Sequence, residues 1–131
     1  MGFDRRHLAV VFAGGFAGAI ARAELAEALT NDVGTWPWAT FLANLAGAFV
    51  LGYVATLLRD RGPRAEIRLR LLGTGFCGAL TTFSALQLEL LTMLDDGEHA
   101  LAAAYAVVSV AAGLALLVSG GALAARRRRA A

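Results

Sequence analysis

The chain has 131 residues, of which 58% are hydrophobic and 17% are charged, a mixture that is too apolar for an ordinary soluble domain. All 12 basic residues are arginines, and with 10 acidic residues they leave a formal net charge of only +2, which excludes a nucleic-acid-binding surface spread over the whole protein. The single cysteine, Cys77, excludes an internal disulfide, and His7 and His99 lie near segment ends, so no metal-ligand cluster is predicted. The composition indicates one membrane domain, residues 1–131, and no enzyme.

Four long apolar stretches predict four transmembrane helices. A helix needs about 20 residues to cross a hydrocarbon core of roughly 30 Å, and it must pair its backbone polar groups within its own segment. We therefore predict an all-α membrane protein with spans at approximately 6–28, 35–58, 69–93 and 99–124. An arginine-rich loop, 59–70, is expected between the second and third spans.

The first span has two possible interpretations. Arg5, Arg6 and the short apolar run that follows imitate a cleavable signal peptide. Gly14 and Gly18 are four residues apart and favour instead a retained helix with a small-residue packing face.

The third span combines glycines with hydroxyl residues at a density that a plain lipid-facing helix would not need. These residues are Gly73, Gly75, Gly78, Thr81, Thr82 and Ser84. We predict a break near Gly78 that faces a subunit interface or an ion path, because irregular backbone at membrane depth requires protein or a polar cavity around it. The alternative is a continuous, tightly packed helix.

The arginines are distributed asymmetrically. Eleven of the 12 lie in the N-terminus, the central loop and the C-terminal tail, which four spans put on one side of the membrane, and none lies in the other two loops. The positive-inside rule predicts that both termini are cytoplasmic. For the tail, 126–129, this topological role is favoured over binding of nucleic acid or anionic lipid.

Polar side chains within the spans are candidates for an ion path. Asn44 is placed near the bilayer midplane, where an unpaired amide is costly, so it needs either a ligand or an interhelical hydrogen bond. Thr40 lies one turn earlier on the same face. Tyr105 and Ser109 repeat this spacing on the fourth span, although such hydroxyls more often bond to their own helix.

Charged and aromatic residues indicate which class of ion such a path would conduct. Arg22 and Glu89 lie toward span ends, where they either snorkel to the interface or line a vestibule. The spans contain no carboxylate pair to couple protons and no acidic ring to attract cations, which favours an anion. Phe83 either packs or presents the positive edge of its ring to a small anion.

Three segments resemble the Fluc (CrcB-type) fluoride channels, and the resemblance covers nearly the whole chain. The segments are GGFAGAIAR at 14–22, WATFLANLAG at 38–47 and GFCGALTTFS at 75–84, followed by Glu89. The third is the most specific, because a glycine-rich stretch that leads into TTFS is peculiar to this family.

The resemblance implies a passive channel that exports fluoride across the inner membrane of a prokaryotic cell. Two subunits are expected to form an antiparallel dimer with two fluoride pathways along the interface. One structural sodium ion, which is not transported, is expected on the two-fold axis. Main-chain carbonyls that correspond to Gly78 and Thr81 of both subunits would hold it.

The resemblance also implies roles for individual residues. Asn44 matches the pore asparagine, and Phe83 matches the first of two phenylalanines whose ring edges contact fluoride. The other implied pathway residues are Thr40, Thr82, Ser84, Tyr105 and Ser109, and the implied vestibule residues are Arg22 and Glu89.

Two positions depart from the family pattern. Leu86 occupies the pathway position where the second phenylalanine is usual, and Gly113 supplies no hydroxyl where the polar track of the last helix would continue. We therefore expect at least one of the two pathways to be weakened. Together with the arginine asymmetry, these departures favour a heterodimer with a paralogous chain of opposite orientation, with a homodimer as the alternative.

Two other functions remain as alternatives. A small proton-coupled multidrug exporter, which is also a four-span antiparallel dimer, would need a carboxylate deep in the first helix. Glu24 and Glu27 lie at the end of that helix. A non-transporting assembly subunit would leave Asn44 and the third-span glycines unexplained.

Overall fold

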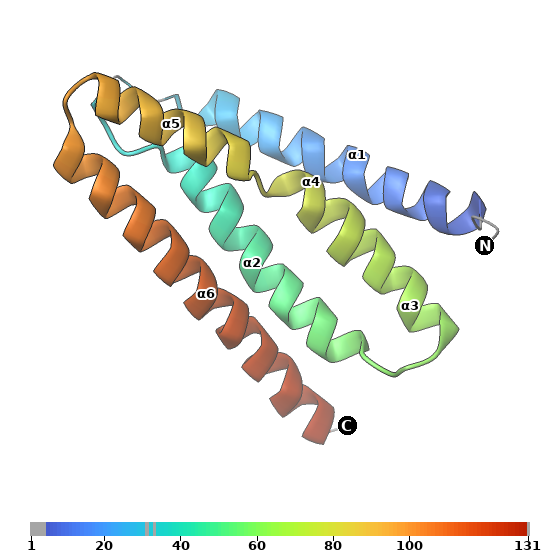
Figure 1. Cartoon of the computed structure of the whole chain (residues 1–131). Helices are drawn as coiled ribbons and strands as arrows, with labels where there is room; N and C mark the ends of the chain where they lie inside the picture. Colours follow the sequence, from blue (N-terminus) through green and yellow to red (C-terminus); the bar gives the residue numbers. More distant parts are fainter. Residues whose placement is uncertain (1–4, 31, 33, 131) are drawn as a thin grey trace.

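The computed structural model describes residues 5–30, 32 and 34–130, and these residues form helices joined by short turns (Figure 1). The elements are α1 (Arg5–Ala28), α2 (Trp38–Leu58), α3 (Pro63–Leu69), the π-helix η1 (Arg70–Cys77), α4 (Gly78–Leu80), α5 (Phe83–Asp95) and α6 (His99–Ala130). The all-helical prediction is therefore confirmed.

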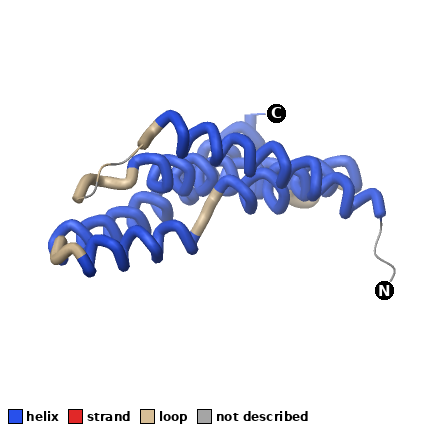
Figure 2. The backbone as a smooth tube through the Cα atoms, turned by 90° about the horizontal axis from the view of Figure 1, so that it is seen from above, coloured by secondary structure: helices blue, strands red, loops and turns tan. Residues whose placement is uncertain are grey.

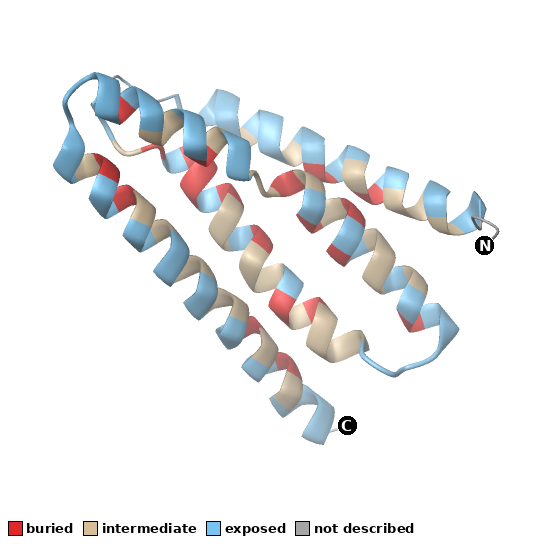
Figure 3. Ribbon diagram, viewed as in Figure 1, coloured by how far each residue is buried: buried red, intermediate tan, exposed pale blue. Residues whose placement is uncertain are grey.

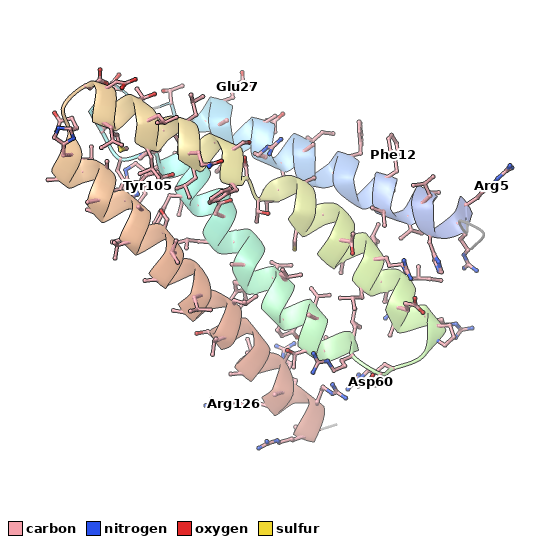
Figure 4. The ribbon with its side chains drawn as sticks, viewed as in Figure 1. Arg5, Phe12, Glu27, Asp60, Tyr105 and Arg126 are labelled. Atoms are coloured by element: carbon pink, nitrogen blue, oxygen red, sulfur yellow. The ribbon has the colours of Figure 1, made fainter. Side chains whose placement is uncertain are left out.

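Four helical segments are long and apolar enough to cross a membrane. They are Arg5–Ala28, Trp38–Leu58, Pro63–Asp95 and His99–Ala130, which confirms the prediction of four spans. The two ends of the chain and the α2–α3 turn lie at one end of the bundle (Figure 1). The labelled side chains Arg5, Asp60 and Arg126 lie at this end, whereas Glu27 lies at the other (Figure 4).

The arginine-rich loop between α2 and α3 is shorter than the sequence suggests. Residues 63–69 form α3, so the expected loop over 59–70 is wrong for most of its length. Pro63 occupies the first turn of α3, where a missing N–H costs nothing. Gly62 before it has φ +83°, a left-handed conformation that glycine adopts without steric penalty.

Two extended residues separate α4 from α5. Thr81 has φ −78° and ψ 151°, and Thr82 has φ −147° and ψ 125°. Gly78, near which the sequence predicts an interruption, is itself helical, and the extended residues lie three and four positions later. Figure 2 shows the extended pair as a straight segment between two helices. The preceding glycines lie in η1, a wider helical turn of a kind that recurs at functional sites.

Glycines allow the helices to approach one another closely. A Cβ atom on Gly14 would collide with the carbonyl oxygen of Leu71, and one on Gly18 would collide with that of Phe76. Gly52 of α2 meets the backbone of α6 in the same way. These contacts seat α1 on η1 and α4, and α2 on α6, as small residues do between membrane helices.

Buried residues concentrate where the helices face one another, and large apolar side chains cover the outside (Figure 3). Leu8, Phe12 and Phe16 are 60%, 73% and 63% exposed at four-residue spacing along α1. Phe12 projects away from the bundle (Figure 4). An exterior of this kind suits lipid rather than water.

Because the backbone of α1 lies close to that of η1, alanine substitutions at two adjacent glycines should differ in their effect on stability. Gly14→Ala should destabilise the purified protein by about 2 kcal/mol, because overpacking against a backbone carbonyl cannot relax by a rotamer change. Gly15→Ala should be neutral, since a Cβ there would lie 3.9 Å from its nearest neighbour, the carbonyl oxygen of Gly75. Thermal unfolding in one detergent would compare the two variants, and equal midpoints would contradict the packing described above.

Candidate functional site

The extended pair is held by a side chain from another helix. Asn44 of α2 donates from Nδ2 to the carbonyl oxygen of Thr82 at 3.0 Å, and the Thr82 amide donates to Asn44 Oδ1 at 2.7 Å. In a continuous α-helix the Thr82 amide would bond to the carbonyl of Gly78. One carboxamide therefore satisfies both backbone groups of a residue that has left the helix.

Thr82 also begins the next helix. Its Oγ1 accepts a hydrogen bond from the amide of Ala85 at 3.2 Å, the usual arrangement of a helix N-cap. The same oxygen lies 3.2 Å from the hydroxyl oxygen of Ser84. The interruption therefore places two hydroxyl groups side by side at the start of α5.

A carboxylate links three helices next to this point. Glu89 of α5 accepts hydrogen bonds from the hydroxyl of Thr40 at 2.5 Å and from the hydroxyl of Tyr105 at 2.7 Å. Tyr105, on α6, is fully buried, and Figure 4 shows its side chain on the inner side of α6. Both carboxylate oxygens of Glu89 are thus bonded to side chains of α2 and α6, and Glu89 also lines a pocket with Asp32 and Thr35 of the α1–α2 turn.

Three of the predicted pathway hydroxyls share a groove with the predicted vestibule arginine. This groove, which we call the Arg22 groove, has a volume of about 470 Å³. Its polar lining residues are Arg22, Thr40, Thr82 and Ser84, and small alanines from α1 and α2 form much of the rest. The structure therefore brings together four of the residues that the sequence singles out.

Other predicted residues line a second groove, the Thr81 groove, of about 480 Å³ between α2, the η1–α4 segment and α6. Gly78, Thr81, Ser109 and Gly113 all line it. The hydroxyl oxygen of Ser109 is buried and has no hydrogen-bond partner within the described part of the chain. A buried hydroxyl without a partner is uncommon in a folded chain.

Phe83 and Leu86 lie in different environments although both are on the first turns of α5. Phe83 is 70% exposed. Leu86 is buried in a cluster with Phe41, Met93 and Tyr105. Neither Phe83 nor Leu86 lines either groove.

The sequence did not indicate that aromatic rings close one end of the Glu89 site. Trp36 packs edge-on against Tyr105 at 5.2 Å and against Phe41 at 5.3 Å between ring centroids. The WPW motif at the start of α2 was the available signal, since it places two large rings one turn before Phe41 and Thr40. These rings pack against the ring of the buried Tyr105.

Main-chain oxygens are the available donors for a metal ion. No group of three or more His, Cys, Asp or Glu side chains that could hold a metal lies among residues 5–30, 32 and 34–130. The Gly78 carbonyl loses its helical partner because the Thr82 amide bonds to Asn44. A Cβ on Gly78 would meet nothing within 4 Å. This carbonyl and that of Thr81 are hard, uncharged donors that fit a monovalent cation, but two donors from one chain are too few to enclose it.

The two hydrogen bonds of the Asn44 side chain predict that removing this side chain lowers the stability of the protein measurably. Asn44→Ala should destabilise the protein by about 2 kcal/mol, because it leaves the N–H and the C=O of Thr82 unpaired. Ser109→Ala is the matched control, since the Ser109 hydroxyl lacks a partner in the described chain and its removal should not lower stability. Thermal unfolding of both variants checks this, and an Asn44→Ala midpoint equal to that of the wild type would refute the backbone role.

Comparison with known proteins identifies the family. The CrcB-like protein family, described as Camphor Resistance (CrcB), matches residues 9–121. Fluoride-specific ion channel FluC 1 of Mycolicibacterium paratuberculosis is 53% identical over 111 residues, which cover 85% of this chain and 84% of that protein. FluC 2 of Moorella thermoacetica is 49% identical over 79% of this chain and 84% of its own length. FluC of Prosthecochloris aestuarii is 44% identical over 88% and 90%.

These relatives are named as ion channels, not as enzymes or drug exporters. The family match and the four helices that can span a membrane describe a multi-pass membrane protein. The chain belongs to the CrcB-like family, the family of the FluC ion channels.

Proposed function

We propose that this protein is a passive, fluoride-selective channel that exports fluoride and so lowers its concentration in the cytoplasm. Three relatives with 44% to 53% identity are named fluoride-specific ion channels. The observation that carries the proposal is the Arg22 groove, where the hydroxyls of Thr82 and Ser84 lie with a guanidinium and without a lining carboxylate. A groove of this composition suits a small anion, because no lining carboxylate repels it.

Fluoride is a small, strongly hydrated anion, so it enters an apolar site only where hydrogen-bond donors replace its water. Neutral hydroxyl donors do this without holding the ion so tightly that it cannot leave. Arg22 at the mouth would raise the local concentration of anions. Movement of fluoride along such a path needs no energy source, because the ion flows down its own concentration gradient.

A single chain does not enclose an ion path, because both grooves are open on one side. We propose that a second subunit of opposite orientation closes them and that the 70% exposed ring of Phe83 faces the resulting pathway. The positive edge of an aromatic ring favours an anion. Asn44 holds the Thr82 backbone and so fixes the position of the residue whose hydroxyl lines the groove.

We propose a related chain as that second subunit, with both termini of the present chain in the cytoplasm. Eleven arginines at one end of this chain and none in the two turns at the other favour a single orientation. The family also includes proteins with numbered names, FluC 1 and FluC 2.

The carbonyls of Gly78 and Thr81 would hold one structural sodium ion between the two subunits. Oxygen donors from both chains would complete its coordination, which neither chain can do alone. The ion would supply a fixed positive charge that joins the two extended segments.

The proposed pathway predicts that Phe83→Ile abolishes fluoride efflux while the dimer remains assembled, because isoleucine has no polarised ring edge. The matched control is Phe12→Ile, which changes an equally exposed ring on a different helix, α1, and should conduct normally. A fluoride electrode would record efflux from vesicles that contain the channel with its partner subunit. Normal efflux through the Phe83 variant would remove this ring from the pathway.

The proposed partner and ion are tested by reconstituting the purified chain alone. In sodium-containing vesicles we expect no fluoride flux, because all chains prefer one orientation. Sodium-dependent flux from this chain alone would overturn the heterodimer. In vesicles that contain the chain together with its partner subunit, flux that is unchanged when N-methylglucamine replaces sodium would overturn the structural ion.

A further inference from the structure

The turn between α2 and α3 forms a cavity of about 400 Å³ at the arginine-rich end of the molecule. We call it the turn cavity. Apolar side chains at the ends of α2 and α3, including Leu58 and Leu69, line part of it, and the charged lining residues are Arg59, Asp60, Arg61 and Glu66. The cavity thus combines apolar surface from a membrane-spanning helix with guanidinium groups.

The charges in this cavity are not balanced. Glu66 accepts hydrogen bonds from Arg70 at 2.7 Å and 3.2 Å, so its charge is neutralised within α3 and η1. Arg59 and Arg61 form no ion pair within the described chain. Asp60 is therefore the one lining carboxylate left to oppose two guanidinium groups, and an anion would be favoured.

The surroundings of the turn cavity are also positive. Segments 59–70 and 126–129 together contain nine arginines and two acidic residues. Arg127 donates to the hydroxyl of Tyr53 at 3.0 Å, and Arg128 donates to the carbonyl of Thr56 at 2.9 Å. Because both acceptors are neutral, the positive charge of the α6 tail remains uncompensated beside the end of α2.

We propose that the turn cavity binds the phosphate of an anionic phospholipid, with Arg59 and Arg61 as its ligands. Guanidinium groups match the geometry of phosphate oxygens and bind them more strongly than neutral donors do. The apolar part of the cavity belongs to the end of a membrane-spanning helix, where the glycerol and acyl chains of a lipid would continue. A soluble phosphate would gain nothing from this surface, and for that reason a lipid is the ligand.

The test uses the purified full-length chain in neutral detergent and follows thermal unfolding as ligand is added. Dioleoylphosphatidylglycerol should raise the midpoint, whereas dioleoylphosphatidylcholine, inorganic phosphate and glycerol 3-phosphate should not. Replacing both lining arginines, Arg59→Gln with Arg61→Gln, should weaken the apparent affinity for phosphatidylglycerol roughly 30-fold, since each basic side chain near anionic lipid contributes about fivefold. Asp60→Asn should strengthen binding, and asparagine tolerates the left-handed φ of 59° at this position.

The matched control is Arg64→Gln with Arg68→Gln, which removes the same charge from α3 at positions outside the turn cavity. It should leave the affinity within about threefold of the wild type, because the two side chains act only through a screened field. Equal losses in the two double variants would show diffuse attraction and overturn the site. Equal stabilisation by inorganic phosphate, or by phosphatidylcholine, would overturn the lipid assignment. If the Arg59 and Arg61 double variant does not fold, unchanged binding in Asp60→Asn still counts against the proposal.

Discussion

Two consecutive residues with extended backbone in an apolar, helical chain leave polar groups that lipid cannot satisfy. The structure meets this requirement with one side chain, because the carboxamide of Asn44 has both a donor and an acceptor and can pair with the C=O and the N–H of Thr82 together. Neither a hydroxyl nor a carboxylate offers this combination in the same geometry. The rest of the candidate site depends on this pair, since it determines where α5 begins and therefore where its hydroxyls and Glu89 lie.

The close backbone contacts around α2 keep this pair in place. Gly14 and Gly18 seat α1 directly on the η1–α4 segment, and Gly52 seats α2 directly on α6. Contacts between backbones leave little room for sliding, whereas long side chains would allow several packings. The Asn44 amide and the Thr82 backbone are consequently presented to each other by rigid elements, a condition for precise polar pairing.

Much of the fold follows from the sequence, because span number depends on hydrophobic length and the small-residue face of α1 depends on a four-residue spacing. The need of Asn44 for a partner was also predictable from the cost of an unpaired amide. Its partner was not, since Thr82 is 38 residues away and no local pattern links them. The same holds for Glu89, whose contacts with Thr40 and Tyr105 depend on the rotation of α5 after two extended residues. Glycines and hydroxyl residues together predict an interruption near Gly78. In the structure the two preceding glycines lie in a π-helix, and the extended backbone begins three residues after Gly78.

Only some of the hydroxyl groups in the proposed anion path have a proton available to donate to an anion. Thr40 lines the Arg22 groove, but it donates its one proton to Glu89 and therefore offers an anion nothing unless that bond breaks. Thr82 and Ser84 are different, because one of them donates to the other and the second proton stays free whichever way the bond runs. Thr82 Oγ1 also accepts from the Ala85 amide, which leaves its own proton unengaged by the cap. The interruption of the helix thus does more than weaken a span, since it creates a cap whose hydroxyl pair always retains one donor toward the groove.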